Sequence, residues 1–261
     1  MADRRYLDRK ELNEKEKFFW DNHLRRKPSF GKVMPLYPIP RYQKIVEDFL
    51  LPLEGKRVLE IGCNSGYLCY YFADRGASVT GVDISGKAIE TAREIKALNP
   101  TKCDIEFQQS PAESLPFEDG YFDVLFSRDV LHHTDFRKSL EECGRVVKRG
   151  GKIVLAETTL TNFLIRLGRD RIIGKLGSKA AKNDTEYPLS GGEIDLIRKK
   201  FGSVEVLGVD FFRLLLRIPF FRKKPWPGLF SAIDDFLFLK MRGLNFLSYE
   251  KIFLITNDPQ I

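Results

Sequence analysis

The chain has 261 residues, 43% of them hydrophobic and 30% charged, which is enough for one α/β domain with a substantial core and added segments. No apolar run reaches about 18 residues and the N-terminus is charged, so neither a membrane span nor a signal peptide is expected. The four cysteines show no zinc or redox spacing, so we expect reduced thiols, no bound metal and a cytoplasmic location.

The net charge of +7 is unevenly distributed along the chain. Residues 1–45 carry 12 basic and 6 acidic side chains, residues 160–189 carry 6 and 3, and residues 211–248 carry 7 and 2. The rest of the chain is therefore acidic. This pattern indicates an anionic partner, substrate or surface that meets the outer segments, although solvated faces explain it equally well.

The first fifth of the chain comes before the part in which strands and helices alternate. Residues 3–24 are highly charged with sparse apolar positions, and a helix is predicted there. Residues 27–40 are interrupted by proline and glycine and predict an irregular connection. Apolar residues at helical spacing predict a helix over 41–51, which Pro52 ends.

A strand, a glycine turn and a helix follow in direct succession. Residues 58–61 form an apolar strand segment, Gly62 comes next, and a helix is predicted from Tyr67. Glycine lets the backbone turn tightly there and lets a ligand approach the helix start. A second strand over 78–83 ends in Asp83, an acid placed to accept hydrogen bonds from ribose hydroxyls.

The glycine spacing differs from the dinucleotide fingerprint, which requires G-x-G-x-x-G. Glu60-x-Gly62-x-x-x-Gly66 followed by Asp83 resembles instead the first two motifs of the class I S-adenosylmethionine (SAM)-dependent methyltransferases. The resemblance implies SAM as cofactor, with Glu60 near its methionine amino group and Asp83 on its ribose. The family usually has a third glycine where this chain has Asn64, a residue that tolerates left-handed backbone.

The loop after the third predicted strand, 105–109, also resembles the family. Residues 110–117 match the loop that contacts adenine in these enzymes, except that Pro111 replaces the usual aspartate. The resemblance therefore implies backbone contacts near Ala112 and Glu113 in place of the side-chain contact.

Strands and helices then alternate to the end of the chain. The remaining predicted elements are a helix over 86–98 capped by Ser85, a strand over 121–127, a helix over 135–147, a strand over 152–157, a helix over 190–201, a strand over 203–209 and a last strand over 251–256. We expect an α/β fold with a Rossmann-like seven-stranded sheet, mostly parallel with an antiparallel last strand, helices on both faces and a helical cap from insertions.

The expected organisation divides the chain into six segments. They are an N-terminal helical or cap segment (1–40), the SAM-binding core (41–159), a cap insertion (160–189), the continued core (190–212), an amphipathic basic cap insertion (213–248) and the last core strand (249–261). Both insertions leave from the carboxyl ends of parallel strands, so we expect them over the ligand face.

The resemblance assigns eleven residues to the cofactor site. They are Glu60, Gly62, Cys63, Asn64, Gly66, Asp83, Ile84, Ala112, Glu113, Ser127 and Arg128. Methyl transfer further requires an aligned acceptor, excluded water and in some enzymes a base. His132 and His133 follow the fourth strand at the ligand edge and are candidate bases, with Glu157 as another; the alternative for the histidines is a packing role.

The substrate class is narrowed by what the fourth strand lacks. Its tip reads Ser127-Arg128-Asp129-Val130. Methyltransferases that act on the exocyclic amino groups of nucleic-acid bases or on glutamine have an Asn-Pro-Pro-Tyr type of motif there instead. The chain resembles the branch with small-molecule and quinone-pathway methyltransferases, which implies a small lipophilic or anionic acceptor and favours O-methylation over N- or C-methylation. A tRNA-modifying enzyme and a non-catalytic binding protein are the alternatives. Nucleic acid is not expected as a partner, and the sequence does not indicate an oligomeric state.

Residues 211–224 combine phenylalanine and leucine with five basic side chains, and Trp226 follows closely. Apolar bulk beside basic residues predicts peripheral contact with an anionic membrane or closure over a lipophilic anion. In a helix, Arg213 and Arg217 would share one face. The alternative is a cap buried against the other outer segments.

Overall fold

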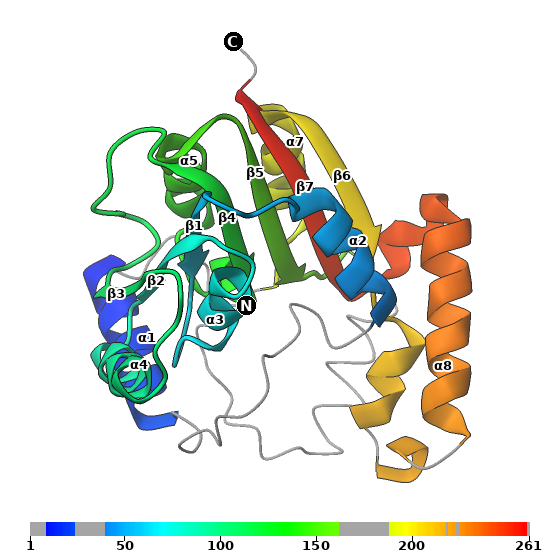
Figure 1. Ribbon diagram of the computed structural model, residues 1–261. Helices are drawn as coiled ribbons and strands as arrows, with labels where there is room; N and C mark the ends of the chain where they lie inside the picture. Colours follow the sequence, from blue (N-terminus) through cyan, green and yellow to red (C-terminus); the bar gives the residue numbers. More distant parts are fainter. Residues whose placement is uncertain (1–8, 24–39, 162–187, 218, 223–224, 260–261) are drawn as a thin grey trace.

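The computed structural model describes residues 9–23, 40–161, 188–217, 219–222 and 225–259. The described chain contains a seven-stranded sheet in the order β3-β2-β1-β4-β5-β7-β6 (Figure 1). Its strands are β1 (Arg57–Ile61), β2 (Ser78–Asp83), β3 (Ile105–Gln109), β4 (Phe122–Arg128), β5 (Val147–Thr158), β6 (Phe201–Gly208) and β7 (Glu250–Pro259). The sheet confirms the predicted α/β fold.

The strand order creates a crevice at the middle of the sheet. β1 pairs in parallel with both β2 and β4. The chain moves outward from β1 through β2 to β3 and then returns to the other side of β1 as β4. Open α/β sheets bind ligands at such a reversal, beyond the carboxyl ends of the strands. β7 is antiparallel to β5 and β6, as predicted for the last strand.

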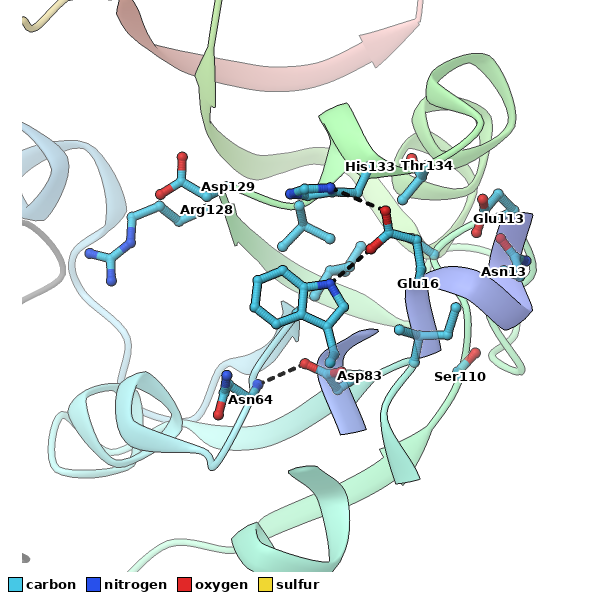
Figure 2. Close-up of a pocket in the computed structure, with 16 residues that line it drawn as sticks. Asn13, Glu16, Asn64, Asp83, Ser110, Glu113, Arg128, Asp129, His133 and Thr134 are labelled. Carbon is cyan, nitrogen blue, oxygen red and sulfur yellow. Dashed lines mark hydrogen bonds and ion pairs between the residues drawn. The ribbon is translucent and has the colours of Figure 1, made fainter. Parts of the chain in front are cut away.

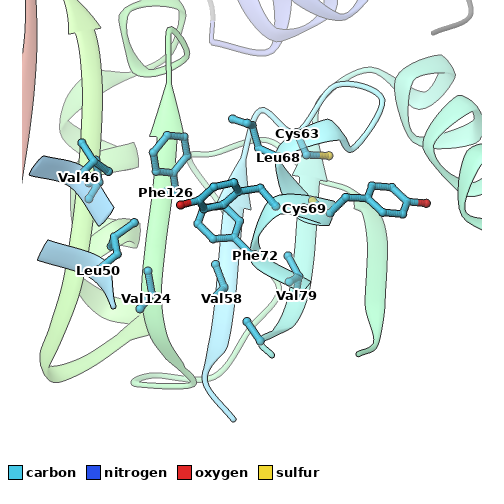
Figure 3. Packing of buried hydrophobic residues seen from close by; sticks show 14 of the residues in the cluster. Val46, Leu50, Val58, Cys63, Leu68, Cys69, Phe72, Val79, Val124 and Phe126 are labelled. Atoms are coloured by element: carbon cyan, nitrogen blue, oxygen red, sulfur yellow. The ribbon is translucent and has the colours of Figure 1, made fainter. Parts of the chain in front are cut away.

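Helices cover both faces of the sheet. α2 (Pro40–Leu50), α3 (Tyr67–Ala73) and α4 (Gly86–Leu98) pack on one face, and α5 (Phe136–Val146) and α7 (Gly191–Lys200) pack on the other. The first layer buries Val46, Phe72 and Phe126 completely, and the two phenylalanine rings meet edge to face at 5.6 Å (Figure 3). Each such ring contributes about 1.5–3 kcal/mol when fully buried, so this layer holds β1 and β4 in place beside the crevice.

Two helices begin at serine caps. The side chain of Ser85 accepts a hydrogen bond from the backbone N–H of Ala88 at 3.0 Å, which confirms the predicted cap of α4. Ser190 and Glu193 form a capping box at the start of α7, with the Glu193 carboxylate accepting from the Ser190 N–H at 2.7 Å. Both caps satisfy backbone donors that the helix itself leaves unpaired.

The second insertion forms short helices at the β6 edge of the sheet (Figure 1). They are η4 (Phe212–Arg217) and η5 (Pro219–Arg222), both 3₁₀, then α8 (Trp226–Asp235), a π-helical turn η6 (Phe236–Lys240) and η7 (Arg242–Leu247). The expected α-helical face shared by Arg213 and Arg217 is wrong, because a 3₁₀ helix completes a turn in three residues. Among the described helices, none combines the length and apolar character needed to span a bilayer.

A buried carboxylate joins η4 to α8. Asp234 is 1% exposed and accepts hydrogen bonds from the backbone N–H groups of Phe211, Phe212 and Arg213 at 2.9–3.1 Å. The first insertion lies almost wholly outside the described residues, as do Lys223 and Lys224.

The helix α1 (Arg9–His23) lies outside the sheet, next to α4 (Figure 1). Leu12 and Glu16 are its buried side chains. The Asp21 carboxylate accepts from the Ser85 hydroxyl at 2.5 Å and from the Lys87 N–H at 3.2 Å, so α1 is attached to the start of α4. A helix was predicted here from the sequence, but not its position.

Candidate active site

The turn after β1 has left-handed backbone at three positions. The φ angle is 74° at Gly62, 49° at Asn64 and 82° at Gly66. A Cβ atom at position 62 would lie 2.2 Å from Val130, and one at position 66 would lie 2.4 Å from the Phe107 ring. Glycine is therefore required at both positions. Asn64 adopts the left-handed conformation expected of it, so the tight turn is kept without a third glycine.

The carboxylate of Asp83 connects the end of β2 to this turn. Its Oδ2 accepts from the backbone N–H of Asn64 at 2.9 Å (Figure 2). Its Oδ1 accepts from the backbone N–H of Ser85 at 2.9 Å. Burial raises the pKa of Asp83. A carboxylate offers about four lone-pair sites, so Asp83 has capacity for hydroxyl donors in the hollow that it lines.

Two adjoining hollows lie at the carboxyl ends of β1, β2 and β4. The larger, about 230 Å³, is shown in Figure 2, and the smaller, about 150 Å³, shares Gly62, Asn64 and Arg128 with it. Nine of the eleven predicted cofactor residues line one or both: Glu60, Gly62, Cys63, Asn64, Asp83, Ile84, Ala112, Glu113 and Arg128. Gly66 and Ser127 line neither, since Gly66 closes the turn and Ser127 is fully buried.

Glu60 lies at the smaller hollow with an exposed fraction of 4%. The Cys69 thiol donates a hydrogen bond to its Oε2 at 2.9 Å. Burial raises the pKa of Glu60 to about 7. A ligand ammonium group would stabilise the ionised form of such an acid. Burial also raises the pKa of the neighbouring Cys63 thiol to about 11, which makes it a poor nucleophile.

The loop after β3 borders the other end of the larger hollow. Ser110, Ala112 and Glu113 line it, whereas Pro111 does not. The Glu113 carboxylate accepts a hydrogen bond from the backbone N–H of Asp135 at 2.9 Å, which ties the loop to the start of α5. The loop therefore borders the hollow at the positions where the sequence predicted its contacts.

His132 and Glu157 form a buried pair behind the hollow. His132 Nδ1 lies 2.6 Å from Glu157 Oε2, and the two side chains are 3% and 0% exposed. The same carboxylate accepts from the backbone N–H groups of Val130 and Leu131 at 3.3 and 2.9 Å. This pair fixes the turn η2 (Leu131–His133) at the tip of β4. Neither side chain lines the larger hollow in the described part of the chain.

His133, in contrast, lines the larger hollow together with α1. Its Nδ1 lies 3.3 Å from Glu16 Oε1, although the two groups are not aligned for a hydrogen bond. The other oxygen of Glu16 accepts a hydrogen bond from the Trp20 indole at 2.9 Å (Figure 2). Sequence reasoning missed Glu16, Trp20 and Asn13 as lining residues, because no local pattern shows which surface α1 covers.

The comparisons with known proteins agree with this geometry. Residues 59–155 match a family described as a methyltransferase domain. The ubiquinone biosynthesis O-methyltransferase of Paracidovorax citrulli is 33% identical over 134 residues, covering 49% of this chain and 56% of the relative. The protein of the same name from Chelativorans sp. is 37% identical over 118 residues, 45% of each chain. This chain thus spans about half the length of the curated relatives it matches.

A solved structure extends the likeness across the sheet. A SAM-dependent methyltransferase from Methanosarcina mazei is similar with a TM-score of 0.52 at 26% identity, over 68% of this chain and 92% of that one. The glycine turn and the acid at the end of β2 provide the features that the predicted cofactor, SAM, requires. Residues 59–155 therefore match a methyltransferase domain, and the described fold is similar to that of a SAM-dependent methyltransferase.

Proposed function

We propose that this protein transfers a methyl group from SAM to an oxygen atom of a small acceptor that is lipophilic or anionic. One observation carries the proposal: His133 lines the same hollow as Asp83 and Gly62, so a candidate base and the cofactor residues share one cavity. The relatives named ubiquinone biosynthesis O-methyltransferases support oxygen as the acceptor atom.

In this proposal the two hollows hold different parts of the cofactor. Asp83 accepts hydrogen bonds from the ribose hydroxyls, and Ala112 and Glu113 border the adenine. The smaller hollow takes the methionine part, whose ammonium group meets the carboxylate of Glu60. When bound, SAM supplies an electrophilic methyl group on a positively charged sulfur.

The proposed base is His133, because it reaches the hollow while His132 is buried against Glu157. His133 removes the proton of the acceptor hydroxyl as the oxygen attacks the methyl group. His132 and Glu157 act as positioning residues that hold the η2 turn. General-base catalysis contributes about 10²–10⁴ in rate, and the residues that line the hollow would align the acceptor.

A single labelling experiment tests the proposal against its alternatives. The full chain is incubated with methyl-labelled SAM and a cell extract, which is then separated into organic-soluble, small aqueous and RNA fractions. We expect label in the organic-soluble or small aqueous fraction, in a product whose labelled methyl group is bound to oxygen. Label in RNA would contradict the proposal and support the tRNA-modifying alternative. Cofactor binding with no label in any fraction would indicate a non-catalytic binding protein.

We also propose that the second insertion rests on an anionic membrane surface and brings the enzyme to a lipophilic acceptor. Five large apolar side chains are exposed there: Phe220, Leu229, Phe236, Met241 and Phe246. Residues 211–248 carry 7 basic and 2 acidic side chains, and one of the acids, Asp234, is buried. Exposed apolar bulk with excess positive charge is the combination that binds anionic interfaces.

Co-sedimentation of the full chain with lipid vesicles tests this membrane contact. Binding to anionic vesicles should exceed binding to neutral vesicles and should weaken as salt rises, because surface charges are screened. Phe236→Ser should weaken it. Phe18→Ser is the matched control, since Phe18 is also exposed, at 73% against 59% for Phe236, but lies on α1. No sedimentation with anionic vesicles at low salt would contradict the membrane role and leave the insertion as a cap only.

A further inference from the structure

Another cavity, of about 530 Å³, lies at the edge of the sheet where α7, β6, β7 and η7 meet. Among the described residues, it shares no lining residue with the two hollows at the proposed cofactor site. A cavity of this volume can hold a small organic molecule, so the chemistry of its lining indicates what it could bind.

Lys251 of β7 is the most deeply buried charged residue of this lining, with an exposed fraction of 3%. Its Nζ donates hydrogen bonds to the hydroxyl groups of Thr159 and Thr161 and to the carbonyl oxygen of Ser248, at 2.9–3.0 Å. These three oxygens match the three donors of the ammonium group, but none of them is charged. Hydrogen bonds to neutral oxygens offset only part of the cost of burying a charge.

Within the described part of the chain, no carboxylate forms an ion pair with Lys251. Glu157 lies opposite Lys251 in the register of β5 and β7, but its carboxylate contacts His132 instead. Burial, together with the charge of Arg198, lowers the pKa of Lys251 to about 7. A buried ammonium group that a second cation repels would be stabilised by an anion in the cavity.

The other charged residues of the lining lie at the solvent-exposed side. Arg198 and Asp195 of α7 form a loose pair at 3.8 Å, with side chains 58% and 64% exposed, and Glu205 of β6 is exposed as well. Water screens exposed charges strongly, whereas the buried Lys251 acts in a lower dielectric. The inner end of the cavity is therefore positive, and Arg198 is placed to bind the same anion from the outer side.

A buried acceptor in the same lining indicates a second feature of the ligand. The Oδ1 atom of Asn245 is buried and has no hydrogen-bond partner among the described residues. Its Nδ2 donates to the carbonyl oxygen of Val206 at 2.8 Å, which fixes the orientation of the amide. A buried acceptor without a donor is costly, and a ligand hydroxyl group would satisfy it.

We propose that this cavity is a second binding site, for a phosphate ester that carries a hydroxyl group. A phosphate monoester has a charge of about −1.5 to −2 at pH 7, which matches the two cations Lys251 and Arg198. The hydroxyl group of the ester donates to Asn245 Oδ1. Phe246, which is exposed and also lines the cavity, is placed to contact the carbon part of the ester. A soluble ester and a lipid headgroup both offer this chemistry.

Calorimetric titration of the full chain with glycerol 3-phosphate tests the site, both without SAM and with saturating SAM. We expect saturable binding that SAM does not displace. Arg198→Gln should weaken it about tenfold or more, because a hydrogen bond to a charged group is lost. Lys199→Gln is the matched control, since Lys199 is the next residue of α7, is exposed and does not line the cavity, so affinity should stay unchanged.

Three results of this titration would overturn the proposal. They are no saturable binding up to about 10 mM ester, equal weakening by the two variants, and displacement of the ester by SAM. Methyl phosphate, which lacks the hydroxyl group, should bind several-fold more weakly than glycerol 3-phosphate, and Asn245→Ala should remove that difference. Equal affinity of the wild type for both esters would overturn the part assigned to Asn245.

Co-sedimentation with vesicles that contain 1-acylglycerol 3-phosphate distinguishes the two sources of the ester. Sedimentation that Arg198→Gln abolishes and Lys199→Gln leaves intact would identify a lipid headgroup as the ligand. Binding of the soluble ester without such sedimentation would identify a free ester, and either result supports the site. Lys251→Met should abolish binding in both assays. If that variant does not fold, Arg198→Gln decides alone, and full binding by a folded Lys251→Met would overturn the proposal.

Discussion

Glu60→Gln should change how the stability of the cofactor-free protein depends on pH. Glu60 is buried, and its pKa is raised from 4.5 to about 7, mainly by desolvation and in part by the charge of Asp83. Arg128 and the Cys69 thiol act in the opposite direction. At about 1.4 kcal/mol per pH unit, the ionised carboxylate destabilises the folded state by about 3 kcal/mol relative to its protonated form.

The sign follows from the raised pKa. Glu60 contributes its full stability below pH 4.5, and this contribution is lost as the pH rises through about 7. Glutamine does not titrate. The free energy of unfolding of Glu60→Gln should therefore rise relative to wild type by about 2–3 kcal/mol between pH 5 and pH 8.

Urea denaturation of both proteins at pH 5, 6, 7 and 8 measures this difference. Saturating SAM should reduce the pH trend in the wild type, because its ammonium group compensates the carboxylate. A stability difference that is constant across this range would refute the reasoning, since it would mean that Glu60 stays ionised in the folded state and that the smaller hollow is more polar than its burial indicates.

Four further predictions concern single side chains of the site and the cap. Asp83→Ala should weaken SAM binding by about 1.5–3 kcal/mol in calorimetry, and unchanged affinity would contradict the assignment. His133→Ala should lower turnover about 10²–10⁴-fold with SAM affinity kept. His132→Ala should instead lower the melting temperature, because the buried Glu157 side chain loses its contact with the imidazole. A loss of turnover in His132→Ala together with a lower melting temperature in His133→Ala would exchange the two roles. Asp234→Ala should cost about 1–3 kcal/mol in urea denaturation, because three backbone N–H groups lose their acceptor; no loss would mean that water replaces it.

Much of the core could be predicted because its signals are local. The glycine turn, the acid at the end of β2 and the cap at Ser85 each depend on residues close in sequence, and the structure has all three. The antiparallel seventh strand was also expected, from the resemblance to the family. Nine predicted cofactor residues meet at one pair of hollows because the strands that carry them end at the same edge.

The rest depends on contacts between distant segments. The separation of roles between His132 and His133 follows from Glu157, 25 residues further along the chain, which buries one histidine and leaves the other at the hollow. Glu16 reaches His133 only because α1 folds onto α4. The 3₁₀ geometry near Pro219 differs from the expected helix, since proline lacks the N–H that an α-helix would use there.

The central claim is that the two hollows at the carboxyl ends of β1, β2 and β4 form the cofactor site. Calorimetric titration of the full wild-type chain with SAM tests this claim most directly. The account predicts saturable binding with one SAM per chain, lost or strongly weakened in Asp83→Ala. Absence of saturable binding up to about 1 mM SAM, where an interaction of only about −4 kcal/mol would be detected, would contradict it.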